Sequence, residues 1–274
     1  MKKKLLTLLF VTSLILSPVI AKTDKTSAEY LQNKKHFAIM NPLAESIAEK
    51  VIKSSLKKET GAKFKVKFEG YTLSSMKKGI FKNLIITGKN VQVDDIEVPY
   101  IRLRTITDYN WVDYTQDPVV FKSDMTFAYD IDLSEKTIND ALKSKEYRKT
   151  IQKVNKRAYP LFTVNNVMVK IRNNKVHVIM EYNFPISPAK QNKTFMVSTG
   201  FHVVDGKIKA QNVGIDNAYG SLPLDKVTNL INLLDPLSFT LSMMDSKKCN
   251  AKIENVNIVD NIIKINGKIF VKGD

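Results

Sequence analysis

KFKVKF, residues 63–68, alternates lysine with an apolar residue at every position. A period of two places the lysines on one face of a β-strand and the apolar side chains on the other. The same alternation returns in residues 125–131 and 195–201. Asn173-Asn174 and Asp205-Gly206, which are pairs typical of hairpin turns, each separate two apolar runs. The sequence therefore predicts a strand-rich chain in which many strands have one solvated face.

Further short apolar runs predict the remaining strands, about ten in all. They occupy residues 79–86, 91–93, 96–103, 167–171, 176–182, 253–258, 262–265 and 269–271, and turn residues at 88–90, 94–95, 260–261 and 266–267 separate them. Most of these strands neighbour one another along the chain instead of alternating singly with helices. That order favours an α+β fold with antiparallel sheets over a doubly wound parallel sheet.

Three amphipathic helices interrupt the strands. Asn41-Pro42 is typical of a helix N-cap followed by proline, and an apolar stripe continues this helix to about Lys58. A second helix is predicted from Ser134 to Val154, and a third over about 223–234. The stripe of the first helix consists of Leu43, Ile47, Ala48, Val51, Ile52 and Leu56. A helix followed by several strands occurs three times, which suggests two or three related units, although no repeat is visible residue by residue.

The first 21 residues have the three parts of a secretory signal peptide. Lys2-Lys3-Lys4 forms the basic region, residues 5–16 form an apolar run, and Val19 and Ala21 are the small residues of a cleavage site. The apolar run is shorter than the roughly 20 residues that span a bilayer. We therefore expect an exported protein that is cleaved after Ala21, and the alternative is a retained N-terminal anchor. Residues 22–40 then form a polar lead-in, and residues 41–274 a single domain.

The composition is that of a globular protein with a substantial core. Of the 274 residues 43% are apolar, and Cys249 is the only cysteine, so the core must hold the fold without an internal disulfide. The net charge is +16, and +13 once the signal peptide is removed. Such a charge indicates either an anionic partner or simply lysine-rich solvated faces. Export argues against nucleic acid as that partner.

No segment has the residues of a catalytic or metal centre. The three histidines are scattered without the spacing of metal ligands, and neither a G-x-S-x-G elbow nor a phosphate-binding loop occurs. Ser75-Met76-Lys77-Lys78 matches the S-x-x-K motif of penicillin-recognising enzymes, but the companion motifs are missing. Asp94-Asp95 and Cys249 are better explained as turn acids and as a small buried apolar residue. We therefore expect no enzyme, no catalytic residue, no metal and no cofactor.

Residues 79–91, GIFKNLIITGKNV, and residues 101–105, IRLRT, together resemble the LmeA-like phospholipid-binding domain family of bacterial envelope proteins. The shared pattern is a glycine, an aromatic residue, a strand, a turn and further strands. The helix over 134–154, Pro223, Pro236 and the strands that end at Lys272 also fit it. The resemblance spans most of residues 43–272. It implies a tubular lipid-binding (TULIP-like) architecture, with curled antiparallel sheets packed on amphipathic helices, and it carries no catalytic residues.

These features predict an exported protein of the periplasm or the outer face of the cell envelope that binds phospholipid and supports envelope lipid or glycolipid assembly. We expect the lipid in an apolar groove between sheet and helices, lined by Ile47, Val51, Phe81, Phe127, Leu230, Leu234, Phe239 and Met243. We expect an anionic membrane surface to meet the basic side chains Lys143, Arg148, Lys149 and Arg157. The alternative is a non-catalytic structural or adaptor protein whose basic face binds an anionic polymer or a protein partner. That alternative predicts a filled core and salt-sensitive binding.

Overall fold

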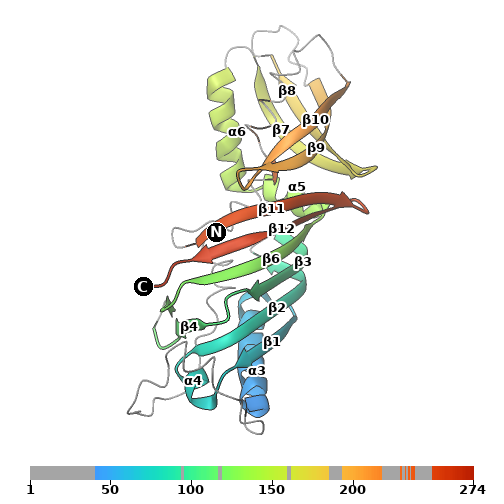
Figure 1. Cartoon of the computed structure of the whole chain (residues 1–274). Coiled ribbons are helices and arrows are strands. Elements are labelled where there is room, and N and C mark those ends of the chain that lie inside the picture. The colour runs from blue at the N-terminus through green and yellow to red at the C-terminus, as the bar shows by residue number, and fades with distance from the viewer. Residues whose placement is uncertain are drawn as a thin grey trace.

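The computed structural model of the chain is a mixed α+β fold built on two antiparallel sheets (Figure 1). It describes residues 41–93, 96–116, 119–158, 162–184, 193–217 and 249–274, together with 229, 232, 234, 236 and 237. The predicted α+β class with antiparallel sheets is confirmed. The predicted signal peptide at 1–21 and the lead-in at 22–40 lie outside the described residues.

The large sheet combines strands from both ends of the described chain. Its strands are β1 (Phe64–Gly70), β2 (Ile80–Val93), β3 (Ile96–Thr105), β4 (Asn110–Asp113), β5 (Val120–Phe121), β6 (Met125–Leu133), β11 (Cys249–Val259) and β12 (Ile262–Val271). β1, β2, β3 and β6 pair in chain order, and β12 of the C-terminal hairpin pairs with β6. β4 pairs with the first residues of β2, and β5 pairs with β4. The last hairpin therefore completes a sheet that the first strands begin.

The small sheet is a meander inserted in the chain between β6 and β11. β7 (Thr163–Arg172), β8 (Lys175–Asn183), β9 (Lys193–Val204) and β10 (Lys207–Asn217) pair in chain order. Its predicted hairpin turns are confirmed, because Asn173, Asn174 and Asp205 have φ angles of 52°, 54° and 52°. Two-residue hairpin turns require this left-handed conformation. The predicted turn at Asp260-Asn261 joins β11 to β12 in the same way.

The first predicted helix is confirmed, and the second is divided in two. α3 (Asn41–Thr60) precedes β1, and a short α4 (Leu73–Lys77) follows it. α5 (Glu135–Leu142) and α6 (Lys145–Ala158) replace the single helix predicted over 134–154, so that prediction is wrong. Ser144 separates the two because its hydroxyl accepts from Tyr147 N at 3.2 Å and starts a new helix. Of the third predicted helix, only residues 229, 232 and 234 are described, and all three are helical.

α3 lies along the outer edge of the large sheet and satisfies part of that edge. An edge strand presents backbone N–H and C=O groups that no neighbouring strand pairs. Glu49 Oε1 accepts from Phe68 N at 3.2 Å, and Glu45 Oε1 accepts from Gly70 N at 2.9 Å. These four residues therefore fix both the position and the rotation of α3 against β1.

α5 and α6 satisfy the edge of the small sheet in the same way. Asn139 Nδ2 donates to Val169 O and its Oδ1 accepts from Val169 N, each at 2.8 Å. Asn155 makes the same two bonds with Val164, also at 2.8 Å. Each side-chain amide thus replaces one peptide group of a missing neighbouring strand.

Both sheets and the helices α3, α5 and α6 share one apolar core. On β6 the buried side chains alternate along the strand, as the sequence predicts, and they are Met125, Phe127, Tyr129, Ile131 and Leu133. The same buried cluster includes Ile52 and Leu56 of α3 and Val169 of the small sheet. A backbone hydrogen bond from Ile253 N to Gly206 O, 3.2 Å long, also joins β11 to the β9–β10 turn.

Two predicted turns lie instead inside continuous strands. β2 keeps one register with β3 through residues 88–90, and only Asn90 (φ 50°), opposite Pro99, leaves the ladder. Proline has no N–H to contribute to a ladder. β12 runs through Asn266-Gly267, where a Cβ on Gly267 would lie 2.7 Å from the hydroxyl of Tyr129. This glycine therefore allows close packing and does not make a turn.

Candidate functional site

α3 carries apolar side chains on two different sides of the helix. Ile52 and Leu56 are buried in the core beneath it. Leu43 and Ile47 are 67% and 52% exposed, and Val51, one turn further on, is half-buried. The single stripe predicted from the sequence thus divides into a buried part and an exposed part, because the glutamates that bind β1 set the rotation of the helix. We call the exposed part, Leu43, Ile47 and Val51, the α3 stripe.

The eight residues predicted to bind lipid occupy different places. Phe81, Phe127 and Leu234 are buried in the shared core, where the rings of Phe81 and Phe68 have centroids 5.2 Å apart. Ile47 and Val51 belong to the α3 stripe. Outside the described residues lie Leu230, Phe239 and Met243. The five described residues therefore divide into two groups, one inside the core and one on the surface of α3.

The predicted basic surface lies mainly on α6. Arg148, Lys149 and Arg157 are exposed. The helix has one acidic residue, Glu146, and six basic ones, which are Lys145, Arg148, Lys149, Lys153, Lys156 and Arg157. None of these six forms an ion pair with another described residue. The helix buries Tyr147 and Val154 on its other side. The exposed side of α6 is therefore strongly basic and wholly polar.

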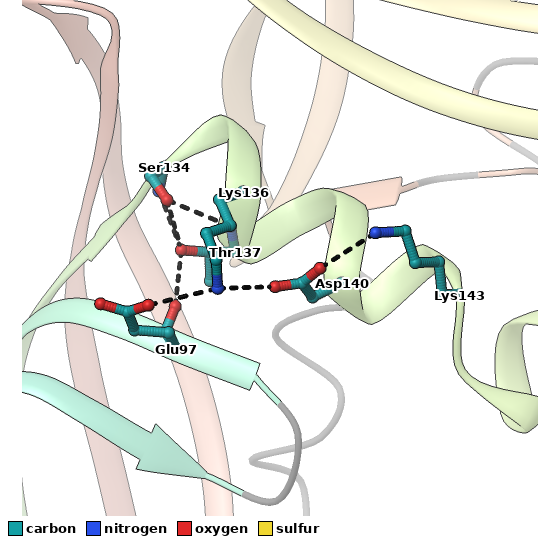
Figure 2. Close-up of polar contacts among 6 residues, drawn as sticks. All are labelled: Glu97, Ser134, Lys136, Thr137, Asp140 and Lys143. Carbon is teal, nitrogen blue, oxygen red and sulfur yellow. Dashed lines mark hydrogen bonds and ion pairs between the residues drawn. The ribbon is translucent and has the colours of Figure 1, made fainter.

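Lys143 differs from the α6 residues because it belongs to a polar network at α5 (Figure 2). Its Nζ lies 3.2 Å from one carboxylate oxygen of Asp140, and Lys136 Nζ lies 3.0 Å from the other. Lys136 also pairs with Glu97 at 3.2 Å, and Thr137 Oγ1 donates to Glu97 O at 2.7 Å, so the network joins α5 to β3. Burial raises the pKa of Asp140, but the hydrogen bonds from the two lysines outweigh it and bring that pKa below its ordinary value. The positive charge of Lys143 is therefore partly balanced by the carboxylate of Asp140.

The outer face of the large sheet is a second basic surface, and the sequence analysis missed it. Cross-strand register aligns six outward residues in a row from β1 to β11, which are Lys67, Ile85, Arg104, Ala128, Lys268 and Lys252. We call this the basic row. It contains no acidic residue, and Lys67, Arg104 and Lys252 are exposed. The alternation in KFKVKF and IRLRT signals each strand's solvated face, but only the register puts these side chains in one row.

Exposed apolar side chains lie beside the basic row. Ile106 and Phe270 are 40% and 43% exposed. Phe270 lies two residues beyond Lys268 on β12, and residues two apart on a strand share a face. Ile106 directly follows β3 and lies two residues beyond Arg104. Ile106 N donates to Thr126 O at 2.9 Å, and Thr126 pairs with Phe270. Ile106, Thr126 and Phe270 thus form a neighbouring outward row, which we call the apolar row.

A small aromatic cluster continues the same face. It consists of Tyr71, Ile80, Tyr109 and Trp111. Ile80 precedes Phe81, whose side chain belongs to the shared core, so the cluster lies on the opposite, outer face. Trp111 is the only tryptophan of the chain, is half-buried, and donates from Nε1 to Lys78 O at 3.1 Å.

Ser75, which begins the S-x-x-K match, has a structural role at the start of α4. Ser75 is buried, and its hydroxyl donates to Thr72 O at 2.8 Å as part of the N-cap of α4. Asp94-Asp95 and the side chain of Cys249 lie outside the described residues. Within the part of the chain that the structure describes, no group of three or more His, Cys, Asp or Glu side chains is placed to hold a metal ion. No helix in that part is both long enough and apolar enough to cross a membrane.

Comparison of the chain with family models, with curated proteins and with solved structures gave no match. The resemblance of residues 79–105 to the LmeA-like family therefore stays a prediction. Three features of the fold are candidates for binding, which are the α3 stripe, the basic side of α6 and the outer face of the large sheet.

Proposed function

We propose that this protein is an exported, non-enzymatic protein of the cell envelope that binds phospholipid at an apolar site on the exposed side of α3, beside the large sheet. The α3 stripe carries the proposal, because it leaves apolar side chains exposed on a helix whose other side is already buried in the core. A contiguous group of exposed apolar side chains marks a binding surface, whereas apolar side chains exposed singly are ordinary. The resemblance to the LmeA-like family adds phospholipid as the ligand.

The apolar side chains of α3 form a path that suits an acyl chain. Leu43 and Ile47 are exposed, Ala48 and Val51 are half-buried, and Ile52 is buried against the sheet. The path covers about 14 Å of helix at 1.5 Å per residue. An acyl chain that follows it gains roughly 0.8 kcal/mol for each buried CH2 group. A curled, TULIP-like arrangement of the large sheet around α3 would lengthen the buried part of this path.

The basic side of α6 would assist binding at an anionic membrane. A lysine or arginine in contact with such a surface contributes about 1 kcal/mol, and one that acts across the solvent contributes less because salt screens it. The exposed charges of Arg148, Lys149 and Arg157 are available for this, whereas Lys143 is already engaged by Asp140. The protein would thus collect or hold phospholipid during envelope lipid or glycolipid assembly.

The test is the lipid content of the purified protein and of two matched variants. Native mass spectrometry of protein purified without detergent is expected to show about one phospholipid per chain. Leu43→Ser/Ile47→Ser removes two apolar contacts worth about 1 kcal/mol each, so its affinity should fall about 30-fold. Lys50→Ser, exposed on the same helix, is the control and should keep its lipid.

Uptake of lipid from vesicles at high salt separates apolar binding from charge attraction, because salt screens only the latter. Wild-type protein should take up lipid there, and the double variant should take up little. A wild-type protein that is purified empty and takes up no lipid under these conditions would refute the proposal.

A second candidate is an adaptor that binds an anionic polymer or a protein partner through α6. The observation that favours it is the wholly polar, strongly basic side of that helix. Such binding would disappear at high salt and would not change in Leu43→Ser/Ile47→Ser. Titration of the lipid-free protein with polyphosphate at low and high salt distinguishes the two.

A further inference from the structure

We propose that the outer face of the large sheet is a membrane-docking surface, with the basic row against anionic phospholipid headgroups and the apolar row inserted at the headgroup level. The partner is a bilayer that contains anionic phospholipid. This inference rests on the outer face alone, so it does not depend on the lipid site proposed at α3.

The basic row concentrates like charge at a cost to the fold. Lys252 and Lys268 lie directly opposite each other, and like charges in that position destabilise a sheet. Lys268 has an acidic partner, Glu254 at 2.6 Å. Lys67 and Arg104 form no ion pair with any described residue. An anionic partner would relieve this repulsion, and the row is therefore suited to bind one.

The next outward row extends the positive charge. Lys65 pairs with Thr87, Thr87 with Arg102, and Arg102 with Asp130, which is the only acidic residue of that row. With strands about 4.8 Å apart, six strands give a face about 24 Å wide. The positive charge is therefore spread in two dimensions, which matches a bilayer surface better than a single polymer chain.

The apolar row favours a bilayer over a soluble polyanion. A soluble polyanion has no apolar part that could cover Ile106 and Phe270, which are exposed beside the basic row. A membrane interface accommodates both kinds of side chain, because basic groups meet headgroup phosphates while apolar and aromatic groups enter the boundary with the acyl chains. The half-buried aromatic residues Tyr109 and Trp111 lie further along the same face and suit the same depth.

α6 has exposed basic side chains but, as far as the structure describes it, lacks exposed apolar ones beside them. Its exposed side is basic but has no exposed large apolar side chain in the described residues. Its charges act through the solvent and are screened over roughly 10 Å at ordinary salt. The outer face of the sheet is therefore the better docking surface, and α6 provides a matched control for it.

Trp111 provides a direct readout in the wild-type protein. Because it is the only tryptophan and lies on the outer face, docking should shift its emission to shorter wavelength. Phospholipids brominated near the headgroup should quench it when phosphatidylglycerol–phosphatidylcholine vesicles are added. Vesicle binding that leaves Trp111 emission unchanged would place the membrane on another face and overturn the proposal.

Two variants with equal loss of charge separate the two basic surfaces. Lys67→Gln/Arg104→Gln should weaken binding to these vesicles about 30-fold, the equivalent of about 1 kcal/mol for each lost cation. Lys149→Gln/Lys153→Gln on α6 should weaken it less than about threefold, since those charges act only at a distance. Equal losses in the two variants, or a larger loss in the α6 variant, would overturn the proposal.

Phe270→Ser tests the apolar row. It should weaken vesicle binding about tenfold and should remove the binding that remains at about 0.5 M salt. If Phe270→Ser has no effect, and if Lys67→Gln/Arg104→Gln weakens polyphosphate binding but not vesicle binding, the face binds a soluble polyanion and membrane docking is wrong. The lipid carried at α3, measured by native mass spectrometry, should not change in any of these variants, so the two proposals fail separately.

Discussion

Replacing Asn155 by alanine removes both hydrogen bonds that join α6 to the edge of the small sheet. Its Nδ2 donates to Val164 O and its Oδ1 accepts from Val164 N, each at 2.8 Å. Val164 is 1% exposed, so water has little access to the backbone groups that would lose their partners. The variant therefore measures what the side-chain amide contributes as a substitute for a neighbouring strand.

The expected loss of stability follows from these two bonds. A hydrogen bond contributes about 1 to 1.5 kcal/mol net, so two contribute about 2 to 3 kcal/mol. Alanine is the better helix former by about 0.6 kcal/mol, which offsets part of the loss. We expect the free energy of unfolding to fall by about 2 kcal/mol and the Tm by about 4 to 8 °C for a protein of this size.

Urea unfolding followed by far-ultraviolet circular dichroism measures this loss. Gln152→Ala is the control, because Gln152 is exposed on the same helix and makes no hydrogen bond to β7; it should change stability by less than about 0.5 kcal/mol. Hydrogen exchange at the Val164 amide should accelerate in Asn155→Ala alone. If both variants are equally stable and the Val164 amide stays protected, helix side chains do not satisfy the β7 edge and the reasoning is refuted.

Three further predictions test other parts of the fold. Gly79→Ala should destabilise the protein by about 3 kcal/mol or more, because the φ of Gly79 is +77° and a Cβ would lie 1.8 Å from Val112 O. Gly61→Ala is the control and should cost only about 1 kcal/mol, because Gly61 has a similar φ of +71° but no atom within 4 Å of the added Cβ. Thermal melts that do not separate the two variants would contradict this. Burial, with Glu254 nearby, raises the pKa of Tyr129 from 10.0 to about 12, so an unfolded chain ionises first, and stability should fall by about 2 to 3 kcal/mol between pH 10 and 12. Tyr129→Phe should lack that part of the alkaline loss in pH-dependent urea unfolding, and an identical pH profile would disprove the assignment. The pKa of Asp140 lies below its ordinary 3.8, so the carboxylate stabilises the fold above pH 3.8 and this stabilisation is lost as the pH falls through the lowered pKa. Asp140→Asn should therefore reduce the free energy of unfolding by less than about 1 kcal/mol at pH 7. The difference in stability between the variant and the wild type should shrink in acid and in high salt.

Local patterns predicted most of the elements correctly. The alternation in residues 63–68 and 125–131 and the turn pairs at 173–174 and 205–206 depend only on the period of a strand and on the left-handed conformation that asparagine, aspartate and glycine tolerate. The break between α5 and α6 was not predicted, because Ser144 resembles any polar residue on a helix until its hydroxyl caps Tyr147.

The candidate sites were harder to predict than the elements. Helical spacing alone put Ile47, Val51 and Ile52 on one stripe, but the hydrogen bonds of Glu45 and Glu49 to β1 turn the helix so that the stripe divides. Likewise, the basic residues of α6 stand together in the sequence and were found there, whereas those of the basic row are distributed over 67–268 and were not.

The sequence by itself determined the class of fold, the polarity of each strand's two faces and the basic character of the protein, because these follow from the period and composition of short segments. Only the tertiary structure decided which side of α3 stays exposed and which basic side chains share a surface. The physical reason is that helix rotation and cross-strand register are set by contacts between residues far apart in the chain, such as Glu45 with Gly70 and Ala128 with Lys268. A shift of one residue in that register would have turned the basic row into the core.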